Sequence, residues 1–250
     1  MDLFNSMLVS MPVADMTGAF ADSTAPGKVI VILLFVGSAW AWTIMVTKWW
    51  QLKHASVATV DLLDAFRSER NPVTLFTKRE GYPGTPLNAI YKAGCVALGA
   101  ELQVHGIDSE DLLMGNLTSD EHRRLSLNQL ETVRAVVDRN VADEALNLED
   151  QMGMLATAVS AAPFLGLLGT VWGVMDAFSG MAESGSAALS AVAPGISGAL
   201  LTTIVGLLVA LPSMIGYNQL SSKIRHISVQ MDNFSQEFIS AIQNTYVIEA

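Results

Sequence analysis

The sequence has little charge and almost no cysteine. Only 15% of its 250 residues are Asp, Glu, Lys or Arg, whereas 51% are hydrophobic. That balance is unusual for a soluble domain and typical of a membrane protein. The single cysteine, Cys95, excludes an internal disulfide, and no metal-ligand spacing surrounds it.

Motifs for catalysis and for nucleic-acid binding are also lacking. The four histidines are far apart, and the sequence contains no HExxH, Ser-His-Asp, CxxC or P-loop pattern. The net charge is −10, and no basic stripe is present for nucleic acid. We therefore expect neither an enzyme nor a nucleic-acid-binding protein, and we expect no metal or organic cofactor.

Long apolar runs predict three membrane-spanning helices, since about 20 apolar residues in a helix cross a bilayer. Val29–Thr47 carries no charge. Gln151–Ser222 is long enough for two spans and contains only two charged residues, Asp176 and Glu183. A turn around Gly180–Ser186 is expected between these two spans.

Positive charges predict the orientation of the spans. Residues 1–27 contain no Lys or Arg, and thirteen of the fourteen Lys and Arg residues follow the first or the third span. The positive-inside rule places that side in the cytoplasm, with Trp49 and Trp50 as an anchor at the inner interface. No cleaved signal peptide is expected, because the N-terminus lacks a basic region. The segment DLFNSMLVSM fits a short interfacial helix and a loosely ordered tail about equally well.

The region after the first span is expected to be helical with interruptions. Asn71-Pro72 and EGYPGTP predict breaks, and GIDSEDLL predicts a helix start at Asp108 or Ser109. One long helix, or two joined helices, should follow from there, since no proline occurs before Pro163. The third span should also continue as a helix, because apolar residues recur at helical steps: Ile224, Ile227, Met231, Phe234, Phe238 and Ile242.

The second and third spans each carry a stripe of small residues. On a helical wheel one stripe contains Gly166, Gly169, Gly173, Ala177 and Gly180, and the other contains Gly195, Ala199, Thr202, Gly206, Ala210 and Ser213. Small residues let helices approach closely in lipid, so plain helix packing would explain each glycine. Packing explains the flanking Thr170 and Thr203 less well, although each hydroxyl could bond to its own helix backbone. Two such stripes with flanking hydroxyls also suit the wall of a narrow polar path.

Asp176 shares the arc of the glycines in the second span, near its outer end. Two interpretations stay open. Asp176 is either an outer vestibule group that attracts protons, or an interfacial residue that caps or pairs with a neighbour. The second interpretation needs no special function and is the one we favour.

Three segments carry a family resemblance. APFLGLLGTVWGVM (Ala162–Met175) and APGISGALLTTIVGLLVALP (Ala193–Pro212) resemble the two signature segments of the TolQ/ExbB branch of the MotA/TolQ/ExbB proton channel family. TPLNAIYKAG (Thr85–Gly94) resembles a weaker family segment. The resemblance implies a homopentamer around a central pore that holds the single-span helices of a TolR/ExbD-type partner dimer. It also implies that protons, as the coupling ion, drive motion that is passed to the cell envelope or to outer-membrane import.

The resemblance assigns residues as well. Thr170 and Thr203 match the family's two pore-lining threonines. The expected set for helix packing and partner contact comprises Pro163, Gly166, Gly169, Gly173, Pro194, Gly195, Gly198, Ala199, Thr202 and Gly206. Many relatives carry a glutamate where this chain has Gly198, so neither signature segment offers a carboxylate deep in the bilayer. We therefore expect the essential proton carrier to be an aspartate on the partner helix.

The expected fold is an all-α membrane protein with three transmembrane helices and long cytoplasmic helical extensions, located in the bacterial inner membrane. Membrane lipids and a TonB/TolA-type periplasm-spanning protein are further candidate partners. The expected segments are a periplasmic N-terminal segment (1–27), transmembrane helix 1 (28–50), a cytoplasmic helical region (51–151), transmembrane helix 2 (152–180), a periplasmic turn (181–189), transmembrane helix 3 (190–216) and a cytoplasmic C-terminal helix (217–250).

Three alternatives compete with this interpretation. A passive membrane scaffold would use the small stripes only for packing. Three spans rather than four argue against a flagellar stator subunit of the MotA type. A secondary transporter would need an inverted repeat, and none is visible in the sequence. The signatures do not separate a TolQ-like role in envelope integrity from an ExbB-like role in nutrient uptake.

Overall fold

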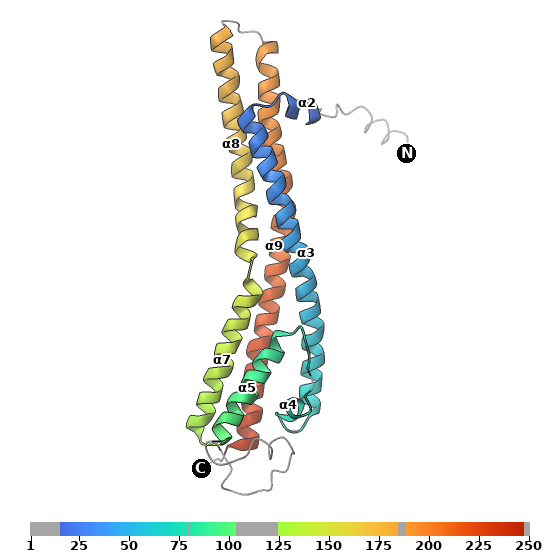
Figure 1. Ribbon diagram of the computed structural model, residues 1–250, viewed down its shortest axis with the longest axis vertical. Helices are drawn as coiled ribbons and strands as arrows, with labels where there is room; N and C mark the ends of the chain where they lie inside the picture. The colour runs from blue at the N-terminus through green and yellow to red at the C-terminus, as the bar shows by residue number, and fades with distance from the viewer. Residues whose placement is uncertain (1–15, 80, 104–124, 185–188, 248–250) are drawn as a thin grey trace, which may run out of the picture. The chain divides into compact units, whose positions relative to one another are not determined.

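The computed structural model describes residues 16–79, 81–103, 125–184 and 189–247. Within these ranges the chain is helical and forms no strand, as the sequence predicts, apart from one isolated bridge between Leu125 and Val247. The helices are α2 (Met16–Ala21), α3 (Ala25–Ser68), α4 (Thr74–Thr77), α5 (Pro86–Gln103), α7 (Leu127–Glu149), α8 (Met152–Ser184) and α9 (Leu189–Tyr246), shown in Figure 1.

Three of the helical stretches are long and apolar enough to cross a membrane, which confirms the predicted number of spans by length and composition. They are α3, the stretch that contains α8, and α9. As predicted, α9 continues well beyond its apolar part, to Tyr246. α8 passes through Gly180 and ends at Ser184, so the turn before α9 is shorter than predicted. A single glycine inside a helical pattern is tolerated, and Gly180 alone therefore does not end the helix.

The chain divides into two compact units, each with its own packing. Unit 1 comprises Met1–Ile44 and Met154–Tyr217, and unit 2 comprises Met45–Gly153 and Asn218–Ala250. Unit 1 therefore holds α2 and the most apolar parts of α3, α8 and α9. Unit 2 holds α4, α5, α7 and the more polar parts of α3 and α9.

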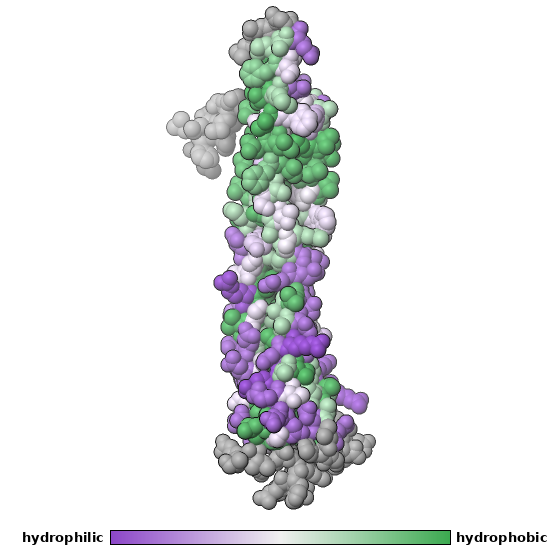
Figure 2. Space-filling model, turned by 90° about the vertical axis from the view of Figure 1, so that its left-hand side faces the viewer, coloured by the Kyte–Doolittle hydropathy of each residue, from purple (hydrophilic) through white to green (hydrophobic). Residues whose placement is uncertain are grey.

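Unit 1 has a small core and a broad apolar exterior. Its buried cluster contains Ile30, Val31, Leu34, Ala162, Leu201, Val205, Val209 and Ala210. Large hydrophobic side chains on all three long helices stay exposed, among them Phe35 on α3, Phe164 on α8 and Leu208 on α9. Figure 2 shows the resulting hydrophobic surface of this unit. Such an exterior suits lipid or neighbouring protein rather than water.

The helix that was expected to run directly into the second span is interrupted just before that span. α7 ends at Glu149, α8 begins at Met152, and between them Gln151 has a φ of 65° in the left-handed region. The predicted start at Asp108 or Ser109 lies outside the described residues. α7 itself begins after Ser126, whose hydroxyl accepts a hydrogen bond from the Gln129 amide while the Gln129 side chain accepts one from the Ser126 amide.

Lys48 accounts for the end of α7 within unit 2. Its side chain is buried, and its ammonium lies 3.4 Å from the Asn147 carbonyl oxygen and 3.3 Å from the Leu148 carbonyl oxygen. The last carbonyls of a helix lack partners within the helix, and they lie at the negative end of its dipole. The Lys48 ammonium therefore satisfies these carbonyls where the chain changes from α7 to α8.

Aromatic side chains form the core of unit 2. Phe66 of α3, Tyr91 of α5 and Phe234 and Phe238 of α9 surround one another, and the Phe66–Phe234 and Tyr91–Phe238 ring centroids are 5.3 Å apart. The Tyr91 hydroxyl donates to the Pro72 carbonyl and accepts from the Phe76 amide, so the loop before α5 is tied to this core. Burial also raises the pKa of the nearby Cys95 thiol to about 12.

Gly94 allows α5 to approach this aromatic core. A Cβ atom at Gly94 would lie 2.4 Å from the Phe238 ring and 2.8 Å from a Val137 methyl group. At Gly99, five residues further along the same helix, a Cβ atom would meet no atom within 4 Å. The two glycines therefore form a matched pair for testing the packing.

We predict opposite effects of alanine at these two glycines. Gly94→Ala should destabilise unit 2 by about 1–3 kcal/mol, because the added methyl group overfills the core. Gly99→Ala should be neutral or stabilising by up to about 1 kcal/mol, because alanine favours the helix. Thermal unfolding of both variants in one detergent measures the difference. Equal stability of the two variants would contradict the close packing at Gly94.

Candidate functional site

The glycine stripe of α8 packs directly against the small stripe of α9. A Cβ atom at Gly173 would lie 2.7 Å from the Ala199 Cβ, and one at Gly169 would lie 2.5 Å from the Thr202 hydroxyl oxygen. These separations are too short for any side chain larger than hydrogen. α8 and α9 therefore approach each other closely along this face, as small-residue interfaces between membrane helices do.

The approach is backbone to backbone at the next turn. A Cβ atom at Gly166 would lie 2.9 Å from the Thr202 carbonyl oxygen, and one at Gly206 would lie 2.6 Å from the Ala162 carbonyl oxygen. Neither obstacle is a side chain that could move aside. Glycine is therefore required at both positions to keep the two helices at this distance.

Three threonine hydroxyls gather at this contact. The Thr170 hydroxyl of α8 bonds to the Thr203 hydroxyl of α9 and lies 3.5 Å from the Thr202 hydroxyl. Thr202 is fully buried, while Thr170 and Thr203 are half-buried. We call Thr170, Thr202 and Thr203 the threonine cluster.

Two backbone carbonyls complete the threonine cluster. The Gly166 carbonyl oxygen lies 3.1, 2.9 and 3.1 Å from the hydroxyl oxygens of Thr170, Thr202 and Thr203. The Ala199 carbonyl oxygen lies 3.1 Å from the Thr170 hydroxyl and 2.7 Å from the Thr202 hydroxyl. Both carbonyls are reachable because no large side chain separates α8 from α9 here.

The threonine cluster has more acceptors than hydrogens to donate. Three hydroxyls supply three hydrogens, and each hydroxyl has at least two possible acceptors within the cluster. A carbonyl oxygen accepts two hydrogen bonds in its lone-pair directions, so the Gly166 carbonyl is not expected to serve all three hydroxyls at once. The hydrogens can therefore redistribute when a water molecule or a carboxyl group approaches the half-buried side.

The threonine cluster has no charged hydrogen-bond partner among the described residues. Among the described residues, no Asp, Glu, Lys, Arg or His side chain hydrogen-bonds to any of the three threonines. Asp176 lies six residues after Thr170, about 9 Å further along α8. It is exposed and has no ion-pair partner in the described part of the chain.

The remaining sequence-predicted residues surround this contact. Pro163 is half-buried inside α8, and Pro194 is exposed inside α9. A Cβ atom at Gly195 would lie 3.1 Å from the Ala177 Cβ, which extends the α8–α9 contact by one more turn. Gly198 faces a different neighbour, described next.

Gly198 packs against the turn between α2 and α3. A Cβ atom there would lie 2.8 Å from the Ser23 Cα and 3.1 Å from the Ala19 carbonyl oxygen, both backbone atoms. Gly198 is buried by these contacts. A larger side chain at this position would have to displace α2 or the turn that follows it.

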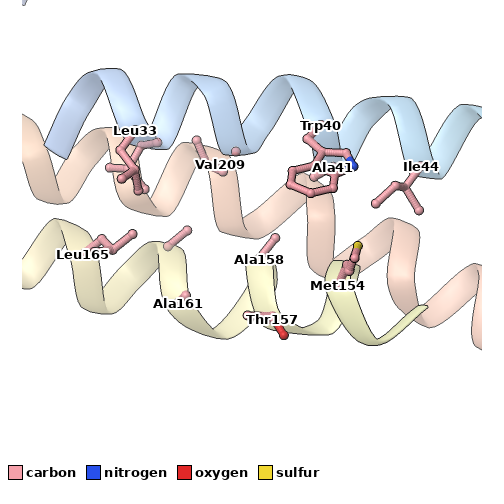
Figure 3. Close-up of a pocket in the computed structure, with 13 residues that line it drawn as sticks. Leu33, Trp40, Ala41, Ile44, Met154, Thr157, Ala158, Ala161, Leu165 and Val209 are labelled. Carbon is pink, nitrogen blue, oxygen red and sulfur yellow. The ribbon is translucent and has the colours of Figure 1, made fainter. Parts of the chain in front are cut away.

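A cavity in unit 1 lies between α3, α8 and α9 and has a volume of about 310 Å³. Figure 3 shows side chains of the three helices around it, including Leu33, Trp40 and Ile44 of α3 and Met154 and Leu165 of α8. No acid, base or histidine lines this cavity. It offers hydrocarbon contact rather than a polar path, so the threonine cluster is the better candidate for proton chemistry.

Comparison with known proteins decides the family. Residues 109–233, which include all of α8 and most of α9, match the MotA/TolQ/ExbB proton channel family. The chain belongs to the MotA/TolQ/ExbB proton channel family. The matched region contains the whole threonine cluster and both small stripes.

Proteins named for two systems are similar to this chain. It is 28% identical over 219 residues to the Tol-Pal system protein TolQ of Haemophilus influenzae, which covers 86% of this chain and 88% of that protein. It is 30% identical over 222 residues to the biopolymer transport protein ExbB of Pseudomonas putida, covering 89% of this chain and 61% of that protein. An 88-residue stretch is 42% identical to ExbB of Salmonella typhimurium, covering 35% of this chain and 36% of that protein.

Thr202 was predicted only as a residue of helix packing and partner contact. Its position in the centre of the small stripe does predict burial against α8, and the side chain is indeed buried. Its hydroxyl nevertheless shares both carbonyl acceptors with Thr170. The consecutive pair Thr202-Thr203 was the available signal, because adjacent hydroxyls on one helix can reach the same partner group from two sides.

We predict that alanine disrupts the α8–α9 contact at Gly169 and is tolerated at Gly180. Gly169→Ala should destabilise the folded protein by about 1–3 kcal/mol, because the new methyl group meets Thr202. A Cβ atom at Gly180 meets nothing within 4 Å, so Gly180→Ala should keep the stability of the unmodified protein. Thermal unfolding in detergent compares the two. A harmless Gly169→Ala would contradict the close approach of α8 and α9.

Proposed function

We propose that this protein is the proton-channel and stator subunit of an inner-membrane motor that converts the proton motive force into mechanical work. The work acts on the cell envelope or on outer-membrane import, together with a TolR/ExbD-type partner. The observation that carries the proposal is the uncharged threonine cluster held between α8 and α9 in a member of a proton channel family. Relatives named for the Tol-Pal system and for biopolymer transport support such a role.

In the proposed assembly the chain forms a homopentamer with α8 and α9 around the pore. The exposed apolar residues of α3, such as Phe35 and Val36, would then face lipid. The N-terminus would be periplasmic and the C-terminus cytoplasmic, because the Lys and Arg residues concentrate after the first and third spans. The α8–α9 turn would lie on the periplasmic side, and unit 2 would lie in the cytoplasm.

We infer that the partner supplies the group that changes charge. Threonine does not ionise near neutral pH, and the threonine cluster has no carboxylate among its contacts. Many relatives carry a glutamate at the position of Gly198, but here the backbone of Ser23 occupies the space that a side chain would need. Asp176 is exposed about 9 Å along α8 from Thr170, which suits an interfacial group better than a carrier inside the pore.

The threonine cluster would then distinguish two states of a partner carboxyl group. An ionised carboxylate accepts hydrogen bonds from the threonine hydroxyls, whereas a protonated one donates to a hydroxyl or carbonyl oxygen. A membrane potential of 100 mV supplies about 2.3 kcal/mol per proton, and a pH unit adds about 1.4 kcal/mol. Both exceed thermal energy of about 0.6 kcal/mol, so alternation of the two states can bias motion of the partner within the pore.

We predict that removing the half-buried hydroxyls lowers the proton flux without unfolding the protein. Thr170→Val with Thr203→Val keeps the side-chain volume and should lower the proton flux at least about tenfold, equivalent to about 1.4 kcal/mol in the barrier. A pH-sensitive dye inside vesicles that contain the protein and its partner measures the flux. Thr43→Val is the matched control, because Thr43 is exposed on α3 and donates only to the Ala39 carbonyl.

Normal assembly with unchanged flux in the double variant would favour the passive scaffold, in which the small stripes serve only packing. If the double variant does not assemble, the proton flux of Thr170→Val and of Thr203→Val is measured separately, each against Thr43→Val. Loss of flux in Thr43→Val as well would contradict a specific role for the threonine cluster.

We also predict the composition of the complex. Intact mass analysis of the protein in mild detergent should give five copies of the 26.7 kDa chain, alone or with two copies of a small single-span protein. The partner's membrane segment should contain an aspartate. A monomer or dimer in several mild detergents would contradict the pore, and a co-purified single-span partner without a membrane aspartate would contradict the proposed proton carrier.

A further inference from the structure

A second polar site lies in unit 2, in a groove between α3 and α9 with a volume of about 470 Å³. Its floor is apolar, since Leu52 and Ile227 are almost completely buried. Its walls carry two ammonium groups, two hydroxyls and one imidazole, from Lys53, Lys223, Ser56, Ser222 and His226. No Asp or Glu lines the groove. It therefore has an apolar base and a rim that is only positive or neutral.

The two lysines of the groove lie in an acidic protein, with 24 Asp and Glu residues against 14 Lys and Arg residues. Some basic side chains of the described ranges pair with acids, as Arg67 does with Glu237 at 2.8 Å. Neither Lys53 nor Lys223 forms an ion pair with an acid of the described ranges. Their charges are therefore uncompensated within the part of the chain that the structure describes.

A tryptophan holds one of these charges in place. The Lys223 ammonium lies 3.5 Å from the centre of the Trp49 ring, in a cation–π contact between α9 and α3. This contact fixes the ammonium beside the groove while leaving its N–H groups free to donate to an anion. Trp49 and Trp50 are both exposed, as amphipathic rings are at the level of lipid head groups.

The groove follows the first and third spans directly along the chain. The charge-free run before Lys48 has 19 residues, Val29–Thr47, and spans about 28 Å as a helix, close to the hydrocarbon thickness of about 30 Å. Lys53 comes six residues later, about 9 Å further along α3. A lysine side chain extends several ångströms, so its ammonium can reach the lipid phosphates from that depth.

We propose that the groove binds the phosphate of an anionic phospholipid head group in the inner leaflet. Lys53 and Lys223 supply the two positive charges. Ser56 and Ser222 supply hydroxyl donors, and neither hydroxyl has a hydrogen-bond partner among the described residues. Basic pockets between membrane helices on the cytoplasmic side recognise anionic lipid by this chemistry. The proposal rests on the proposed insertion in the inner membrane, and it is independent of proton conduction.

Retention of lipid by the full-length protein tests this site. The protein is reconstituted with phosphatidylcholine and a minority of phosphatidylglycerol, extracted in mild detergent, and its bound lipid is measured by native mass spectrometry. The unmodified protein should retain phosphatidylglycerol. Lys53→Gln with Lys223→Gln should lower the retained phosphatidylglycerol at least about tenfold. Lys53→Arg with Lys223→Arg should retain as much of it as the unmodified protein does.

A matched control variant loses two positive charges outside the groove. Lys92→Gln with Arg139→Gln removes two exposed positive charges from α5 and α7, and this variant should retain lipid like the unmodified protein. Equal retention by the glutamine variant of the groove would overturn the proposal. So would equal loss of lipid in the control variant, which would indicate general charge attraction.

Two other occupants of the groove would give distinct results. Inorganic phosphate bound with the same affinity in lipid-free detergent would identify a site for a free anion and would overturn the assignment to lipid. A smaller oligomer with unchanged lipid in the glutamine variant would assign the groove to a neighbouring copy of the chain, with the same consequence. The lipid measurement does not depend on proton flux. A negative lipid result therefore does not contradict the proposed role of the threonine cluster, and an unchanged proton flux does not contradict the lipid site.

Discussion

The close approach of α8 and α9 is the constraint on which the candidate site depends. At Gly166, Gly169 and Gly173 the distances to the opposite helix leave no room for a methyl group. Lipid does not drive apolar helices together, so tight backbone contact and hydrogen bonds must hold them. The glycines allow the contact, and the contact in turn brings the carbonyls of Gly166 and Ala199 within reach of threonine hydroxyls.

That arrangement explains why the site is polar and yet uncharged. A buried charge in a membrane helix is expensive, whereas hydroxyls satisfied by carbonyls are tolerated. The hydrogens of the threonine cluster have several acceptors within the cluster. In the proposed function they would reorient around a partner's carboxyl group, and the chain would house a proton carrier without providing one. The filled space at Gly198, occupied by the Ser23 backbone, fits the same division of roles.

Unit 2 is held together by large side chains rather than by small ones. Its core depends on aromatic rings from α3, α5 and α9, and on Gly94, which lets α5 come close to Phe238. One of its polar contacts serves a helix end, where the Lys48 ammonium meets the last carbonyls of α7. Lys223 and Trp49 then join α3 to α9 beside a groove whose lysines form no ion pair with an acid of the described ranges. The long helices thus pass from a region packed by small residues to one packed by large ones.

Much of this protein could be predicted from its sequence, because membrane insertion imposes simple rules. Uncharged runs of the right length predicted the three spans, and helical spacing predicted both small stripes and the buried face of α9 as far as Ile242. The end of α8 was misjudged, because Gly180 resembles a turn residue but is only one glycine within a helix. Tertiary structure alone decided which hydroxyls meet. A helical wheel puts Thr202 in the packing stripe and Thr203 beside it, but the distance between α8 and α9 determines that both reach the Gly166 carbonyl. The groove of unit 2 depends in the same way on contact between helices more than 150 residues apart in the chain, which no local pattern encodes.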